Sequence, residues 1–485
     1  MKKIVVAVDS FKGCLGSLEV ADAIEAGIKA VHPRCEVVKV PVADGGEGTV
    51  QALVGATGGR MRALTVTGPL GRPVRAAYGI LGPATANVAV NTTAATAANS
   101  PANAASANAT AAVANAHATA ADINSTANIA NAHAATPDSP AATANSLAIT
   151  ANANSTAAAA NANSTTAANA HATADINAAA ANAAAHTAAG TAIIEMAAAS
   201  GLPLVPPGER NPMETTTRGT GELIADALAR GCRRILLGIG GSATNDAGAG
   251  MLQALGYRFF DAAGAELGRG GKILERIARV DAAGANPLLR ETEFRVACDV
   301  DNPFHGPRGA AHVYGPQKGA DPQMVAALDR GLARFAGVIR AHTGRDIAAA
   351  PGAGAAGGLG GALLAFLDAR LQPGIALVLE TLRFDELLAG ASLVITGEGR
   401  MDAQTAMGKA PQGVAAAAAR CGVPVIALAG GVEDAAAINR LGIAGVFSIM
   451  PRPMSLQDAM APGTAAKNIR VLVTQLFQTL AATRS

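Results

Sequence analysis

The chain lacks tryptophan, and aromatic residues make up only 3% of its 485 residues. Alanine and glycine are abundant instead, which favours α/β packing with helices close to a sheet. An excess of one charge is also missing, because 38 basic residues balance 36 acidic ones. This balance gives no electrostatic footprint for nucleic acid or for a membrane surface. Any anionic ligand must therefore be held by a local site.

The sequence also lacks a Cys-x-x-Cys pair and any apolar run long enough to span a bilayer. Its five cysteines lie far apart, which is typical of reduced thiols in a cytosolic protein. The apolar run after Lys3 ends at Asp9 and is too short for a signal peptide. We therefore expect a cytoplasmic protein without a membrane partner.

One long tract differs from the rest of the chain. Residues 83–189 contain no Lys, Arg, Glu, Gly or aromatic side chain and consist mostly of Ala, Asn, Thr and Ser. Its few large apolar residues bury too little surface to offset chain entropy, so we predict a disordered or loosely coiled loop. Its four histidines match no spacing typical of metal ligands. Because loop-closure entropy grows slowly with length, such an insert is tolerable at a surface turn.

Outside this tract the pattern predicts an α/β protein with two domains. Both chain ends show buried strands followed by loops rich in glycine and charged residues, and the middle begins with a hairpin at 64–81. We predict a discontinuous outer domain of residues 1–62 and 290–485. An inner domain at 63–289 would be interrupted by the tract. A cleft between them is the default ligand site. The strands expected are 4–8, 36–42, 191–196, 235–239, 294–298, 392–396, 423–429 and 444–450; the helices are one beginning with Ser17 as N-cap, then 219–230, 411–420 and 465–480.

The segment 238–248 follows a predicted strand and precedes a helix. Its consecutive small residues expose backbone N–H groups, which attract phosphate. Ser242 and Thr244 add hydroxyl groups, and the Asp246 carboxylate is suited to hold Mg²⁺ or to accept a proton. The segment is not a Walker A loop, since no Gly-Lys-Ser/Thr follows. The alternative is an ordinary tight turn between a strand and a helix.

Similar polar loops recur at other predicted strand ends, where open α/β sheets bind ligands. Ordinary turns and solvated ion pairs are the alternative explanation for each of them taken alone. Together they supply what a kinase needs, namely phosphate-binding groups, a metal carboxylate and a base. A serine hydrolase would need a Gly-x-Ser-x-Gly elbow, and a nicotinamide oxidoreductase a dinucleotide fingerprint, and both are missing. The charged residues in these loops are Lys12, Asp44, Asp299, Lys318, Glu398, Arg400, Asp402 and Lys409.

Taken together, these segments resemble the bacterial glycerate kinases of the first type, the glycerate 2-kinases. The resemblance covers the chain except residues 83–189. It implies transfer of the γ-phosphate of ATP, with Mg²⁺, to D-glycerate, giving 2-phosphoglycerate. It also implies a Rossmann- or flavodoxin-like parallel sheet formed by both chain ends, with a second α/β domain inserted. Ala247 departs from the family, which usually has glycine there. The motifs that carry the resemblance are 9–13, 43–49, 194–197, 217–221, 240–246, 297–303, 315–319, 354–360 and 396–411.

The resemblance also suggests roles for individual residues. As catalytic residues we expect Asp246, Asp44, Lys12 and Asp402. For the nucleotide phosphates we expect Gly240, Gly241, Ser242, Thr244, Lys318 and Lys409. For glycerate we expect Ser10, Arg218 and Arg400, and for the metal Asp246 and Asp299. The alternatives left open are a kinase of a related hydroxy or sugar acid and an inactive homologue disrupted by the tract. The residues alone decide neither the 2- or 3-phosphate product nor whether the chain forms a homodimer.

Overall fold

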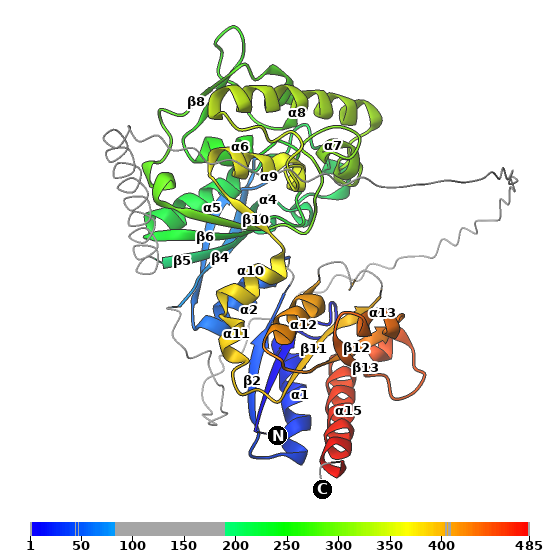
Figure 1. The fold of residues 1–485 in the computed structure, drawn as a ribbon. Helices are drawn as coiled ribbons and strands as arrows, with labels where there is room; N and C mark the ends of the chain where they lie inside the picture. The colour runs from blue at the N-terminus through cyan, green and yellow to red at the C-terminus, as the bar shows by residue number, and fades with distance from the viewer. Residues whose placement is uncertain are drawn as a thin grey trace, which may run out of the picture. The chain divides into compact units, whose positions relative to one another are not determined.

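Two β-sheets organise the computed structural model of the chain (Figure 1). The structure describes residues 2–43, 45–46, 48–82, 190–402, 405 and 409–483, which all belong to one compact unit. The predicted base Asp44 and the tract at 83–189 lie outside the described residues. None of the helices described is long and apolar enough to cross a membrane.

The first sheet is built from both chain ends and has five parallel strands in the order β13-β12-β11-β1-β2. The strand β1, which lies between β11 and β2, is buried on both faces, as its run of β-branched residues predicts. The predicted parallel sheet from the two ends of the chain is therefore confirmed. The strands are β1 (Lys3–Val8), β2 (Glu36–Pro41), β11 (Leu393–Met401), β12 (Val425–Val432) and β13 (Ile443–Ser448).

Helices cover both faces of this sheet. On one face, α1 (Ser17–Val31) and α15 (Pro462–Ala482) lie side by side and share an apolar core with alternate residues of β1 (Figure 1). The other residues of β1 pack into a second core with α2 (Thr49–Thr57), α10 (Gly374–Thr381) and α12 (Ala410–Arg420). Small connecting helices are α11 (Phe384–Leu387), α13 (Ala435–Asn439) and α14 (Leu456–Ala459).

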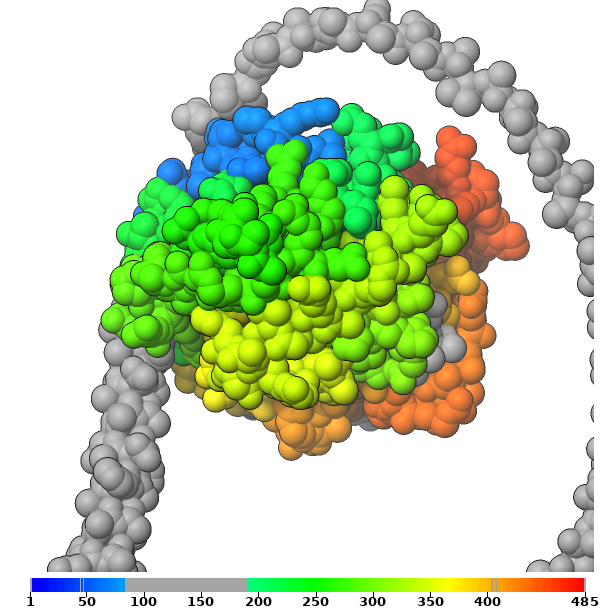
Figure 2. All heavy atoms as spheres, turned by 90° about the horizontal axis from the view of Figure 1, so that it is seen from above, coloured from blue at the N-terminus to red at the C-terminus, as the bar shows by residue number. Residues whose placement is uncertain are grey.

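The second sheet has six strands in the order β10-β9-β6-β5-β4-β3 and is mixed. The predicted hairpin forms its antiparallel edge, and the other neighbours are parallel from β5 onward. Viewed from above, the green-to-yellow part of the chain, which includes α8, forms much of the visible surface (Figure 2). The strands are β3 (Arg60–Thr67), β4 (Pro73–Ile80), β5 (Gly190–Glu195), β6 (Cys232–Gly238), β9 (Glu293–Ala297) and β10 (Arg370–Gln372), with β7 (Arg258–Phe260) and β8 (Arg279–Asp281) paired apart. The helices are α4 (Ala197–Ser200), α5 (Arg218–Ala229), α6 (Ala249–Ala254), α7 (Ala310–Tyr314), α8 (Pro322–Thr343) and α9 (Ala355–Phe366).

Two local predictions are wrong. The strand predicted at 392–396 does not end at Thr396, because β11 continues to Met401. It continues there because it stays paired with β12, so that Glu398 pairs with Ala429 and Arg400 with Gly431. Ser17 is the first residue of α1 and not its N-cap, and the Gly16 N–H is bound by the Glu19 side chain instead.

The predicted domain limits stay a prediction. The strands of the six-stranded sheet extend from Arg60 to Gln372, past the limit predicted at residue 290. The residues that flank the tract lie on neighbouring antiparallel strands, since Ile80 pairs with Ala192 and the Leu81 N–H donates to the Thr191 carbonyl at 2.9 Å.

Candidate active site

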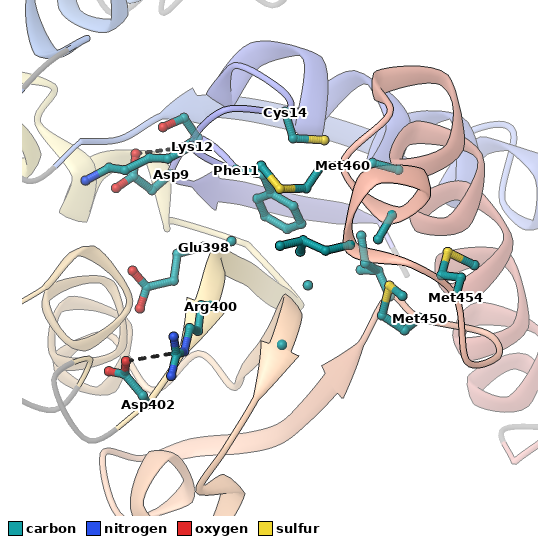
Figure 3. Close-up of a pocket in the computed structure, with 18 of the residues that line it drawn as sticks. Asp9, Phe11, Lys12, Cys14, Glu398, Arg400, Asp402, Met450, Met454 and Met460 are labelled. Atoms are coloured by element: carbon teal, nitrogen blue, oxygen red, sulfur yellow. Dashed lines mark hydrogen bonds and ion pairs between the residues drawn. The ribbon is translucent and has the colours of Figure 1, made fainter. Parts of the chain in front are cut away.

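The first pocket lies at the carboxyl ends of β1, β11 and β12 and encloses about 590 Å³. We call it the outer pocket. It brings together five of the predicted site residues, Ser10, Lys12, Arg400, Asp402 and Lys409. Figure 3 shows that charged side chains gather at one end and apolar ones at the other. The charged end has Asp9, Lys12, Glu398, Arg400 and Asp402, and the apolar end has Phe11, Met450, Met454 and Met460.

The charged end is held by a local hydrogen-bond network. The Thr405 hydroxyl donates to Glu398 Oε1 at 2.6 Å, and the Asp402 N–H donates to the same hydroxyl oxygen at 3.1 Å. Burial raises the pKa of the Glu398 carboxyl, whereas the bond from Thr405 and the charge of Lys409 lower it. Arg400 lies 3.7 Å from Asp402 and also pairs with Glu433. The strand end thus presents acidic and basic groups together.

The second pocket lies at the carboxyl ends of β6 and β9 and encloses about 440 Å³. We call it the inner pocket. Its walls include Gly240, Gly241 and Ser242 after β6, and Asp299 after β9. Lys12 lines this pocket as well as the outer one. A single residue therefore borders both cavities.

A close approach at Gly45 brings the two sheets together beside the inner pocket. Gly45 follows β2 with a backbone φ of +86°, and a Cβ there would lie 2.6 Å from the Cβ of Ala297. Only glycine adopts this conformation without strain and leaves room for β9. The turn after β2 is thereby fixed against the end of β9. Asp44 itself lies outside the described residues, but Gly45 and Gly46 line the inner pocket.

A buried lysine forms the deepest part of the inner pocket. The Lys318 side chain is 2% exposed, and its ammonium donates to Ser242 Oγ at 2.8 Å and to the Thr244 carbonyl at 2.7 Å. Burial lowers the pKa of Lys318 to about 7, and the charge of Asp246 opposes this shift. The Thr244 side chain is itself fully buried, so this residue contributes its carbonyl oxygen to the lysine.

Asp246 is engaged by backbone and side-chain donors around it. Its carboxylate accepts hydrogen bonds from the Thr217 N–H and hydroxyl, at 2.8 and 2.9 Å, and from the N–H groups of Gly248 and Gly250, at 3.2 Å each. Burial raises the pKa of this carboxyl, and the hydrogen bonds oppose that change. Three of these donors bind Oδ2, and the Gly248 N–H binds Oδ1. Asp246 thus ties the start of α5 to the start of α6.

Asp299 is the predicted metal ligand that faces a cavity. Its Oδ1 accepts the Gly374 N–H at 2.9 Å, which links the end of β9 to the start of α10. Among the residues described, no three His, Cys, Asp or Glu side chains form a cluster that could hold a metal. Mg²⁺ commonly takes only one or two protein carboxylates and completes its shell with phosphate and water. Asp299 fits that role, whereas Asp246 is buried and lines neither pocket in the described part of the chain.

Comparison with known proteins agrees with this geometry. A sequence profile of the Glycerate kinase family matches residues 4–113 and 150–481. The chain belongs to the glycerate kinase family. Glycerate kinase of Bacillus subtilis (strain 168) is 42% identical over 458 residues, covering 94% of this chain and 92% of that protein. For glycerate 2-kinase of Escherichia coli (strain K12) the identity is 39% over 458 residues, covering 94% and 93%.

A solved structure shows the same fold in this glycerate kinase family. The protein described as glycerate kinase 2 from Salmonella typhimurium LT2 superposes with a TM-score of 0.72 at 38% identity, covering all of this chain and 99% of that one. The family profile also extends into the tract from both sides, to residue 113 and from residue 150. The family match therefore covers more of the chain than the sequence motifs predict, since those motifs all lie outside residues 83–189.

The structure gathers most, but not all, of the site residues predicted for this glycerate kinase family member. Arg218 lines neither pocket in the described part of the chain and instead pairs with Glu222 at 3.1 Å on α5. Asp9 and Glu398 line the outer pocket but were not among the predicted site residues. Their signal in the sequence was a place beside a buried apolar strand: Asp9 follows β1, and Glu398 follows the apolar part of β11.

Proposed function

We propose that the chain is a glycerate kinase that transfers the γ-phosphoryl group of ATP to the 2-hydroxyl group of D-glycerate. The observation that carries this proposal is Lys12, which lines both pockets. Phosphoryl transfer needs two substrates held in line and cations that neutralise the charge of the transition state. Lys12 borders both cavities, so its ammonium would serve where the two substrates meet.

In this reaction the 2-hydroxyl oxygen forms a bond to the γ-phosphorus while the bond to the β-phosphate oxygen breaks. ADP leaves, and the hydroxyl proton passes to a carboxylate. Asp402, which lines the outer pocket, and Asp44, which lies outside the described residues, are the candidates for this base. Lys12 and Lys318 would neutralise the glycerate carboxylate or the phosphoryl group in transit.

Asp299 would hold Mg²⁺ beside the inner pocket. When bound, the ion neutralises the charge of phosphate oxygens and orients them. Asp246 would act through Lys318, because the ionised carboxylate favours the charged form of the buried lysine. ATP as phosphate donor fits the cytoplasmic location expected from the cysteine pattern.

The test is an ADP-release assay on the full chain with MgATP, with and without D-glycerate. We expect ADP release that depends on D-glycerate, and a ³¹P NMR spectrum that shows 2-phosphoglycerate as product. Parallel assays with L-glycerate, other hydroxy acids and sugar acids separate the related kinases. If none of these acids stimulates ADP release, the proposal is wrong. A larger kcat/KM for another acid would reassign the substrate.

A further inference from the structure

The outer pocket lies at a topological switch point of the five-stranded sheet. In the order β2-β1-β11-β12-β13, the strand β1 has β2 on one side and β11 on the other. The chain passes from β1 to β2 and later returns to the other side of β1 as β11. In open α/β sheets of this kind, ligands bind outside the carboxyl ends of the two strands that flank such a point. Asp9, Ser10 and Lys12 follow β1, while Glu398 and Arg400 lie at the end of β11. The topology therefore places a ligand in this pocket.

The apolar end of the outer pocket is suited to bind a flat ring. Phe11 and Met450 lie at this end together with Met454 and Met460 (Figure 3). Methionine side chains adapt to aromatic surfaces and make favourable sulfur–aromatic contacts. Leu456 also lines the pocket. The side chains of Leu456 and Met460 are 75% and 37% exposed, so two large apolar groups at the rim lack full cover from the rest of the described chain.

The floor between the two ends is formed by glycines. Gly430 and Gly431 line the pocket near the end of β12, and a Cβ at Gly431 would have no neighbour closer than 4.0 Å. The missing side chains leave the backbone accessible to a ligand. Beyond this floor lies the charged end, where the cations Lys12, Arg400 and Lys409 accompany the carboxylates of Asp9, Glu398 and Asp402. A ligand with an apolar ring at one end, and at the other end phosphate groups that these cations can bind, matches this sequence of surfaces.

We propose that the outer pocket binds the purine nucleotide, with the base among Phe11, Met450 and Met460 and the phosphates directed toward Lys12. This assignment rests on the proposed kinase function. It leaves the inner pocket, with its buried Lys318 and its glycine walls, to the small hydroxy acid. The glycine segment 240–244, predicted from the sequence to bind nucleotide phosphates, would then contact the acid.

Three features of the inner pocket support this division. The helix that follows segment 240–244 is α6, which has only six residues and gives little dipole for a triphosphate. The Lys318 ammonium already donates to two protein oxygens, so it presents a fixed charge suited to one carboxylate. The inner cavity is also the smaller one, at about 440 Å³ against about 590 Å³.

The experiment measures binding of ADP and of inorganic triphosphate to the full chain by isothermal titration calorimetry. One variant, Met460→Ser, changes the apolar end, and a second, Gly431→Val, fills the floor of the pocket. Both should fold, since Met460 is partly exposed and the space at Gly431 is open. The matched control is Met61→Ser, because Met61 is 45% exposed on β3 and lies outside the pocket.

We expect both pocket variants to raise the Kd of ADP at least about tenfold, because apolar contact with the base is lost or blocked. The Kd of triphosphate should change less than about twofold, and Met61→Ser should leave both constants unchanged. An unchanged ADP affinity in both pocket variants would overturn the inference, as would the absence of ADP binding to the native chain. Glycerate-dependent ADP release, measured in parallel, tests the proposed function separately. A chain that binds ADP in this pocket without phosphorylating glycerate would retain the inference and lose the function.

Discussion

Replacing Lys318 with methionine gives the sharpest test of the inner pocket. Methionine keeps the length of the apolar stem and removes the ammonium that donates to Ser242 and Thr244. If Lys318 neutralises a substrate charge, kcat/KM for D-glycerate should fall at least about a hundredfold, the effect of losing one preorganised donor in an enclosed site. The Met61→Ser variant, which changes an exposed methionine on β3, should keep native turnover.

The pH dependence identifies which form of Lys318 is active. Burial lowers its pKa to about 7, and kcat/KM at saturating MgATP reports the groups that bind glycerate. If the charged form binds the acid, kcat/KM should decline about tenfold per pH unit above pH 7 and be about a hundredfold lower at pH 9. A rise with pH over this range would instead make the neutral amine a base. A flat profile would remove Lys318 from both roles.

Stability decides whether lost activity reflects lost structure. Unfolded lysine has a pKa of 10.5, so between pH 7 and 10.5 the unfolded chain binds one proton more than the folded chain at this site. The folded state therefore becomes more stable as the pH rises through this window. At pH 7 and below the burial penalty is fully present, about 4–5 kcal/mol at about 1.4 kcal/mol per pH unit.

The methionine variant loses this penalty and also loses two hydrogen bonds from a charged donor, each contributing about 1.5–3 kcal/mol. These terms nearly cancel, so we expect the free energy of unfolding at pH 7 to change by less than about 2 kcal/mol. Urea denaturation measures it. A loss above about 5 kcal/mol would contradict the cancellation, and the fall in kcat/KM would then need no catalytic explanation.

Three further predictions concern other parts of the chain. Asp246→Asn should lower the free energy of unfolding by about 2–4 kcal/mol, because the new amide N–H₂ group would face N–H and O–H donors that now bind the carboxylate. A folded variant with near-native kcat would exclude a metal-ligand or base role for Asp246. Tyr78→Phe should cost about 1–2 kcal/mol in urea denaturation, because the hydroxyl donates to Asp226 at 2.7 Å, and unchanged stability would show that this bond contributes nothing. Replacing residues 83–189 by a turn of about four residues should stabilise the chain by about 3 kcal/mol through loop-closure entropy and keep ADP release; a lower stability would contradict the pairing of β4 with β5.

Continuous apolar strands made the parallel sheet predictable from the sequence. The β-branched run of β1 is buried on both faces, and this pattern has few other solutions in a chain of this composition. The hairpin was equally predictable, since Gly68 to Gly71 supply a turn between two strands. The length of β11 was not predictable, because glycines normally weaken a strand. Here they are retained by pairing with β12, a non-local contact that local propensity does not encode.

The candidate site was predictable as a set of strand ends but not as two cavities. Loops after parallel strands lie at one edge of a sheet, so grouping Lys12 with Arg400 and Asp402 needed only the order of elements. The burial of Lys318 was not predictable, since a lysine in a glycine-rich segment is expected at the surface, where it can bind phosphate. Its partner Ser242 lies far away in the sequence, and only the tertiary fold brings the two within 2.8 Å.

The position of the tract bears on whether this chain is an inactive homologue. The tract joins the end of β4 to the start of β5. Because β5 runs parallel to β6 and β9, its start lies at the sheet edge opposite the carboxyl ends that form the inner pocket. The strand ends and turns that supply Ser242, Asp299 and Lys318 are therefore uninterrupted. To interrupt the segments that form the inner pocket, an insertion would have to lie at the carboxyl ends of these strands. The structure therefore favours a chain whose catalytic framework is intact.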